Sequence, residues 1–124
     1  MSKRVLLIDD EIALLQGLAP FLEDVGYEVL TATDAGAAMG VLRGQEPVAI
    51  VCDLRLPGVG GTEFYDAVQA NPRWRKIPFV FVTGERQASV QTGRAGGGAT
   101  RVLTKPFDPE DLVAILGEEV AAQP

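Results

Sequence analysis

The residues Val48-Ala49-Ile50-Val51-Cys52-Asp53 form an apolar run that ends in a carboxylate, and this stretch defines the expected fold. Pro47 precedes the run, and a Pro57-Gly58 turn follows it. An apolar run of this length between such boundaries predicts a strand buried on both faces. Open parallel sheets hold their functional groups at the carboxyl ends of strands, so Asp53 is the candidate reactive group.

Length and composition predict a single domain over residues 1–124, with one core. Apolar residues make up 47% of the chain and charged residues 23%, as in an ordinary globular protein. The formal net charge of −6 argues against direct binding to nucleic acid or to an anionic membrane. No apolar run reaches the length of a membrane span, and the first 20 residues lack the pattern of a secretory signal.

The counts of cysteine and histidine exclude several kinds of chemistry. Cys52 is the only cysteine, so the chain has no internal disulfide, and a reducing, cytoplasmic location is the default expectation. The sequence has no histidine. It therefore lacks the commonest general base and metal ligand, and it cannot itself carry a phosphohistidine.

Strand and helix patterns alternate along the whole sequence. The predicted strands cover residues 3–8, 27–33, 48–53, 77–82 and 101–104. The predicted helices cover residues 12–25, 34–43, 62–70 and 87–94, with a last helix after Asp108-Pro109. Five β-α repeats predict an α/β fold: a doubly wound, flavodoxin-like parallel sheet covered by helices on both faces, with strand order 2-1-3-4-5 and right-handed connections.

The first helix carries signals for its start, its end and a possible break. Asp10 is the expected N-cap, and Gly26 is the expected C-terminal stop. Pro20 lies within the apolar periodicity and predicts a kink or an early end.

Residues 54–76 are predicted to contain a glycine-rich loop, a helix and a basic loop. The glycines of residues 54–61 would let the backbone approach a ligand closely. The helix that follows is expected to bury Phe64, Ala67 and Val68. The Arg-Trp-Arg-Lys sequence at 73–76 is interpreted as a solvated loop.

Polar side chains interrupt the strands at their carboxyl ends. Asp9 and Asp10 follow the first strand, Asp53 ends the third, Thr83 follows the fourth and Lys105 follows the fifth. Parallel strands present these ends at one rim of the sheet, so the five residues are expected to converge there.

The chemistry of such a rim fits phosphoryl transfer. Three crowded carboxylates repel one another and require a compensating cation, and oxygen ligands of this kind suit Mg²⁺. Lys105 adds a mobile positive charge, and Thr83 adds a hydroxyl donor. Asp53 would then attack phosphorus to form an acyl phosphate, and hydrolysis would return the carboxylate.

These residues together resemble the response regulator receiver domain of two-component signalling, a family that includes chemotaxis regulators. The resemblance covers essentially the whole chain and rests on the motifs Asp9-Asp10, Asp53, Thr83 and Lys105-Pro106-Phe107. It implies a phosphorelay signalling module, not an enzyme with an external substrate. The phosphoryl group would come from a histidine kinase or a histidine phosphotransfer protein, and the module would catalyse its own phosphorylation and dephosphorylation.

The resemblance also implies a ligand set for Mg²⁺. Asp10 and Asp53 would bind the ion directly, Asp9 through water, and Arg55 through its carbonyl oxygen. Thr83 would move toward the phosphoryl group while Lys105 pairs with it. The family often has a cis peptide before the proline, which makes Lys105–Pro106 the candidate.

One position departs from the family pattern. Many receivers have a tyrosine or phenylalanine three residues before the lysine, where this sequence has Val102. A valine cannot act as a large swinging ring, and Gly96-Gly97-Gly98 lies just upstream. We therefore expect signalling to depend on reshaping of residues 84–100. A homodimer could form through residues 87–94, strand 101–104 and the last helix.

Three other functions are considered. The first is a receiver-like protein-interaction domain that is never phosphorylated, against which the intact acid cluster argues. The second is a phosphohydrolase resembling the haloacid dehalogenase group. Those enzymes require the motif Asp-x-Asp after the strand, and this chain has Arg55 where the second aspartate would be. The third is flavin binding, which the acids Asp9-Asp10-Glu11 oppose because they would repel phosphate.

Overall fold

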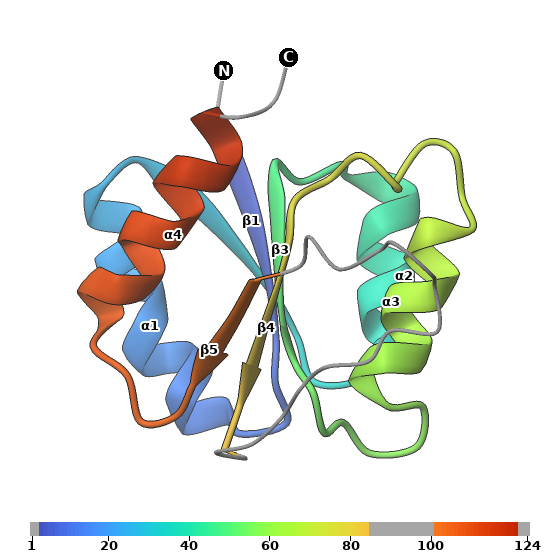
Figure 1. Ribbon diagram of the computed structural model, residues 1–124, viewed down its shortest axis with the longest axis horizontal. Coiled ribbons are helices and arrows are strands. Elements are labelled where there is room, and N and C mark those ends of the chain that lie inside the picture. Colours follow the sequence, from blue (N-terminus) through green and yellow to red (C-terminus); the bar gives the residue numbers. More distant parts are fainter. Residues whose placement is uncertain (1–2, 85–100, 122–124) are drawn as a thin grey trace.

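The computed structural model describes residues 3–84 and 101–121 (Figure 1). The strands are β1 (Lys3–Ile8), β2 (Tyr27–Ala32), β3 (Ala49–Asp53), β4 (Phe79–Thr83) and β5 (Arg101–Thr104). The helices described are α1 (Ile12–Asp24), α2 (Ala35–Gly44), α3 (Gly61–Gln69) and α4 (Pro109–Ala121). The predicted helix at 87–94 and the glycine run at 96–98 lie outside the described residues.

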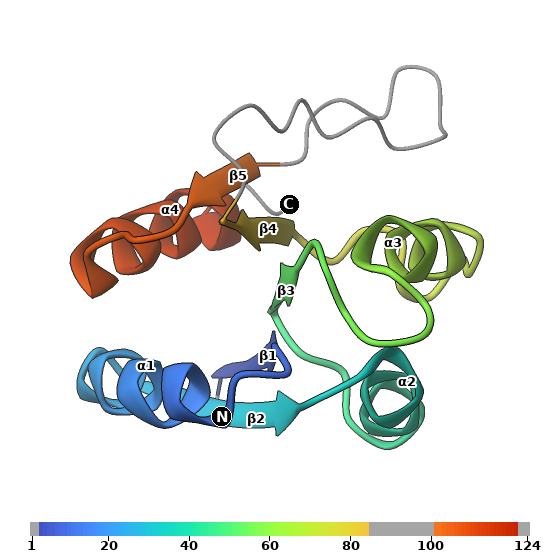
Figure 2. The ribbon, with the colours of Figure 1, turned by 90° about the horizontal axis from the view of Figure 1, so that it is seen from below.

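The strands form one parallel sheet in the order β2-β1-β3-β4-β5, as predicted. Helices α1 and α4 cover one face of the sheet, and α2 and α3 cover the other (Figures 1 and 2). The α/β doubly wound fold expected from the sequence is therefore confirmed. Every strand runs in the same direction, so the carboxyl ends of β1, β3, β4 and β5 meet at the rim seen in Figure 2.

Side chains that alternate along the strands divide the core into two layers. Leu6 and Ile8 of β1 join the cluster beneath α2 and α3, whereas Val5 and Leu7 join the cluster beneath α1 and α4. Strand β3 is buried at every residue, because the sheet is covered on both sides. The central position of β3 holds Asp53 firmly at the rim.

Cys52 behaves as a small buried hydrophobic residue. Its side chain has no exposed surface, and its thiol donates to the carbonyl oxygen of Asp53 at 3.2 Å. Burial raises the pKa of the Cys52 thiol well above its ordinary value, and the charges of Asp53 and Asp9 raise it further. A thiolate is the reactive form, so the fold suppresses its reactivity.

Helix α1 differs from its sequence prediction at its start, and one of the two outcomes predicted for Pro20 is excluded. Its N-cap is Glu11, and no side chain caps it, so the prediction that Asp10 is the cap is wrong. The helix continues past Pro20 to Asp24, which excludes an early end. Proline has no N–H to donate to the carbonyl oxygen four residues before it. Pro20 is exposed, so water can bind that carbonyl instead. Gly26, with φ of 101°, follows the helix end as predicted.

Helix α3 and the basic segment after it bury two aromatic residues, Tyr65 and Trp74, that were not predicted to be buried. Ala67 is exposed, and Tyr65 is buried in its place with its ring edge-on to Phe79 at a centroid distance of 4.9 Å. Trp74 is only 6% exposed, so the segment 73–76 is not a fully solvated loop. The aromatic side chains of β4 determine which face of α3 is covered. No helix in the described part of the chain is long and apolar enough to cross a membrane.

Candidate functional site

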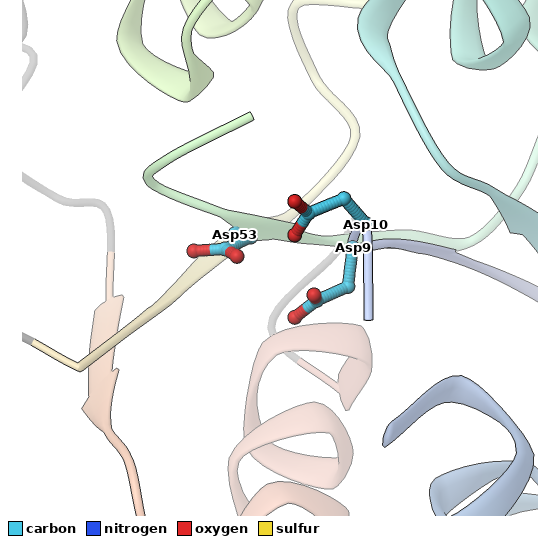
Figure 3. Close-up of side chains that lie close together, drawn as sticks. All are labelled: Asp9, Asp10 and Asp53. Atoms are coloured by element: carbon cyan, nitrogen blue, oxygen red, sulfur yellow. The ribbon is translucent and has the colours of Figure 1, made fainter. Parts of the chain in front are cut away.

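Three aspartates from two strands meet at the rim formed by the carboxyl ends. Asp53 ends β3, Asp9 and Asp10 follow β1, and the side chains point toward one space (Figure 3). One carboxylate oxygen from each lies within 4.8 Å of the other two. Asp9 and Asp53 are buried, whereas Asp10 is exposed. Asp10 therefore belongs to this cluster and does not cap α1.

Backbone hydrogen bonds orient Asp9. Its amide donates to the carbonyl of Ala32 on β2 at 3.1 Å, which extends the sheet pairing by one residue. Its Oδ1 accepts the amide of Glu11 at 2.8 Å. One carboxylate oxygen is thus occupied by the start of α1, and the other faces the rim.

Asp53 is held in an electrostatic balance. Burial raises its pKa above the ordinary carboxyl value, and the negative charge of Asp9 adds to that effect. The amide of Arg55, which donates to Oδ1 at 3.1 Å, and the ammonium of Lys105 act in the opposite direction. The carboxylate is therefore costly to keep ionised, and an added cation would favour its charged form.

Lys105 supplies the positive charge of the site. Its Nζ lies 2.9 Å from Asp9 Oδ2, 3.2 Å from Glu11 Oε1 and 3.4 Å from Asp53 Oδ2. Burial acts to lower the pKa of Lys105, but its hydrogen bond to Asp9 and the charges of Asp9 and Asp53 outweigh burial, so the pKa is raised. The amide of Lys105 donates to Thr83 O at 2.7 Å, and Lys105–Pro106 is cis, as expected.

Gly61 closes the loop between β3 and α3. Its amide donates to Leu54 O at 2.9 Å. A Cβ at this position would press against the carbonyl oxygen of Asp53 and would lie 2.9 Å from both Leu54 Cα and Leu54 O. The sequence predicted that these glycines let the backbone approach a ligand. At Gly61, the close approach is instead to the backbone that carries Asp53.

The other predicted residues lie at or beside the same rim. Thr83 ends β4, is 1% exposed, and pairs in register with Thr104 of β5. Arg55 lies two residues after Asp53, where its amide contacts the carboxylate. Val102 on β5 is 37% exposed, and it is a valine where many receivers have an aromatic residue. The proposed reshaping of residues 84–100 falls mostly outside the described residues.

The donor set fits a hard divalent cation. Mg²⁺ prefers oxygen ligands such as carboxylates and usually keeps several waters. One oxygen from each of the three aspartates lies within 4.8 Å of the other two, so all three are close enough to share one cation. Asp10 is exposed to solvent, so the water ligands that Mg²⁺ usually keeps would have access to the site.

Two residues of this site were not identified from the sequence. Glu11 was considered only as part of the acidic run Asp9-Asp10-Glu11 and not as a site residue, yet its carboxylate contacts Lys105. Gly61 was one of several loop glycines, and its contact with β3 needs the path of α3 in space. The acidic run Asp9-Asp10-Glu11 was a sequence signal that could have identified Glu11. No local sequence pattern distinguishes Gly61 from the other loop glycines.

An apolar groove of about 550 Å³ adjoins this site. Its walls come from Leu14 and Leu18 of α1 and from Pro106 and Phe107, and Lys105 lies at its edge. Ile12 at the start of α1 is 58% exposed. An apolar surface therefore lies beside the charged rim.

Most of the chain is similar in sequence to a known protein family. The sequence model of the response regulator receiver domain matches residues 5–117. Response regulator Rre1 of Synechocystis sp. is 34% identical over an alignment of 125 positions, which covers 96% of this chain and 52% of that protein. The chain spans about half the length of several curated relatives that it matches.

Solved structures show the same fold. The chemotaxis response regulator CheY4 of Vibrio cholerae is 32% identical, with a TM-score of 0.85 over 96% of this chain and 99% of that one. The receiver domain of sensor histidine kinase PA1611 from Pseudomonas aeruginosa PAO1 has a TM-score of 0.84 at 23% identity, covering 98% of this chain and all of that one. That protein has a magnesium ion coordinated in its active site cleft.

Proposed function

Because this chain belongs to the response regulator receiver domains, signalling modules of two-component systems, we propose that Asp53 accepts a phosphoryl group in a Mg²⁺-dependent reaction. The donor would be a phosphohistidine of a histidine kinase or phosphotransfer protein. One carboxylate oxygen of Asp53 forms the new O–P bond as the N–P bond of the donor breaks. Attack of water on phosphorus later releases phosphate and returns the carboxylate.

The observation that carries this proposal is the contact of Lys105 with Asp53. A lysine ammonium 3.4 Å from a buried carboxylate at the end of a central strand is positioned to meet an oxygen of a phosphoryl group placed there. Thr83, at the end of the neighbouring strand, would donate its hydroxyl to another phosphoryl oxygen. The charge that develops on the transferred group would thus face donors on two sides.

The metal would be held by the aspartates of the rim. Asp10 and Asp53 would bind it directly, Asp9 through water, and the carbonyl oxygen of Arg55 would complete the protein ligands. Bound Mg²⁺ would offset negative charge on the phosphoryl oxygens and on the clustered carboxylates. Lys105, released from part of its pairing with Asp9, could then turn toward the phosphoryl group.

The partner surface would lie beside this rim. The exposed Ile12 and the groove between α1 and Pro106-Phe107 offer apolar area for the donor protein. A homodimer could use β5 and α4, together with the predicted helix at 87–94. We further propose that residues 1–124 constitute one receiver domain that acts in the cytoplasm.

Incubation with Mg²⁺ and acetyl phosphate tests the proposal. We expect a mass increase of one phosphoryl group in the wild-type protein, no increase in Asp53→Asn, and no increase when EDTA removes the metal. Absence of any adduct in the wild type would favour a receiver-like interaction domain that is not phosphorylated. Turnover of an added phosphomonoester would instead indicate a phosphohydrolase.

A further inference from the structure

The ammonium group of Lys105 is shared by three carboxylates, and one of them has no part in the aspartate cluster. Asp9 and Asp53 contribute both to this sharing and to the cluster. Glu11, at 3.2 Å from Nζ, is not among the residues whose oxygens converge there. The side chains of Asp9 and Asp53 are 3% and 8% exposed, whereas that of Glu11 is 65% exposed.

The backbone places Glu11 where it can hold Lys105 from the solvent side. Glu11 is the N-cap residue of α1 in an extended conformation, and its amide is bound to Asp9 Oδ1 at 2.8 Å. This backbone hydrogen bond fixes the position of Glu11 beside the rim, and its carboxylate is held there with it. Lys105 lies between two buried acceptors and one exposed acceptor.

We propose that Glu11 is a positioning residue that retains Lys105 and thereby slows phosphorylation of Asp53. This inference rests on the proposed function. A cation bound by the aspartates neutralises Asp9 and Asp53 and weakens their hold on Lys105, but it leaves the more distant Glu11 as an acceptor. Glu11 then competes for the ammonium group with the oxygens of the incoming phosphoryl group.

Two variants of Glu11 separate this contact from a general effect of charge. Glu11→Gln keeps the length of the side chain and removes its charge. Glu11→Asp keeps the charge but withdraws the carboxylate by one C–C bond, about 1.5 Å. Glu23→Gln, an exposed change at the other end of α1, is the matched control for lost negative charge.

The first measurement is the rate of adduct formation with acetyl phosphate at saturating Mg²⁺. Both Glu11 variants should react about two- to fivefold faster than wild type, the range expected for a partly exposed ion pair. Glu23→Gln should react at the wild-type rate. A faster reaction in Glu11→Gln alone would show a general charge effect and would overturn the inference, as would two unchanged rates.

The second measurement is the Mg²⁺ dissociation constant by calorimetry, without a phosphoryl donor. Without the Glu11 contact, Lys105 is held by Asp9 and Asp53 alone and competes more strongly with the ion. Glu11→Asp should therefore weaken Mg²⁺ binding about two- to fivefold. In a Lys105→Met background, the same change should leave the dissociation constant unaltered, and an equal loss there would overturn the inference.

The two measurements distinguish failure of the inference from failure of the proposed function. A wild-type protein that forms no adduct refutes the function, while the Mg²⁺ cycle still reports whether Glu11 acts through Lys105. An adduct that forms at the same rate in both Glu11 variants leaves the function standing and refutes the role of Glu11. Melting curves of each variant verify that it is folded.

Discussion

Substitution of Gly61 by alanine tests how the loop after β3 supports the site. The added Cβ would lie 2.9 Å from Leu54 Cα and Leu54 O and would press against the Asp53 carbonyl. Ordinary carbon contacts lie at about 3.5–4.0 Å, so the backbone must separate by about 0.5–1 Å. The partner atoms are main chain, and Leu54 N is bonded to Val82 O at 2.9 Å, so β3 cannot move alone.

The expected cost follows from this crowding. Insertion of a methyl group into a packed site costs about 1–3 kcal/mol, and the gain in helix propensity is small at the first residue of α3. For a domain of this size, about 3–6 °C in Tm corresponds to 1 kcal/mol, so Gly61→Ala should melt about 3–18 °C lower. Displacement of Asp53 should also reduce the stabilisation by Mg²⁺.

Thermal melting with and without Mg²⁺ measures both effects. Gly40→Ala in α2 is the control, because a Cβ there meets no atom within 4 Å. That variant should be as stable as wild type or more stable by up to about 1 kcal/mol. If Gly61→Ala melted with the wild type and kept the full Mg²⁺ response, the close approach inferred between α3 and β3 would be refuted.

Three further predictions concern the site and the core. Burial raises the pKa of Asp53, so the native state holds its proton to higher pH than the unfolded chain, and stability falls as pH rises through that window. In EDTA at pH 7, Asp53→Asn should therefore melt above wild type, and the gap should close in acid, where the wild-type carboxyl is also neutral; equal melting at every pH would contradict this. Mg²⁺ at ten times its dissociation constant should stabilise the wild type by about 1.4 kcal/mol, and Asp10→Asn should lose most of that gain; a wild-type melting curve indifferent to Mg²⁺ would argue against a shared site. Phe81 is fully buried among aromatic rings, so Phe81→Ala should lower the free energy of unfolding in urea by about 3–5 kcal/mol, and a loss below 1 kcal/mol would show that the core is packed differently.

The sheet and the residues at its rim could be predicted from the sequence because the patterns that indicate them are local. The apolar run of β3 predicts burial on both faces, and the acid at its end indicates where the core stops. Alternation of strands and helices then leaves few topologies, and the expected order 2-1-3-4-5 is observed. The convergence of Asp9, Asp10, Asp53 and Lys105 follows directly from that order.

Errors arose where two local signals competed or where a neighbour decided. Asp10 is a good capping residue by type, but its carboxylate faces the cluster at the rim, and Glu11 takes the N-cap position. Tyr65 replaces Ala67 in the core because the rings of Phe79 and Phe81 lie opposite that side of α3. Helical periodicity alone does not distinguish these neighbouring faces.

The sequence by itself determined the order of the elements, the buried strands and the set of acids and cations at their ends. Only the tertiary structure decided how those groups are paired. Lys105 and Asp9 are 96 residues apart in the chain, yet their side chains are 2.9 Å apart. The partners of a long charged side chain depend on the approach of distant backbone segments, and so does the contact of Gly61 with the carbonyl of Asp53. Burial periodicity is a property of neighbouring residues, whereas these contacts exist only once the strands and helices are packed.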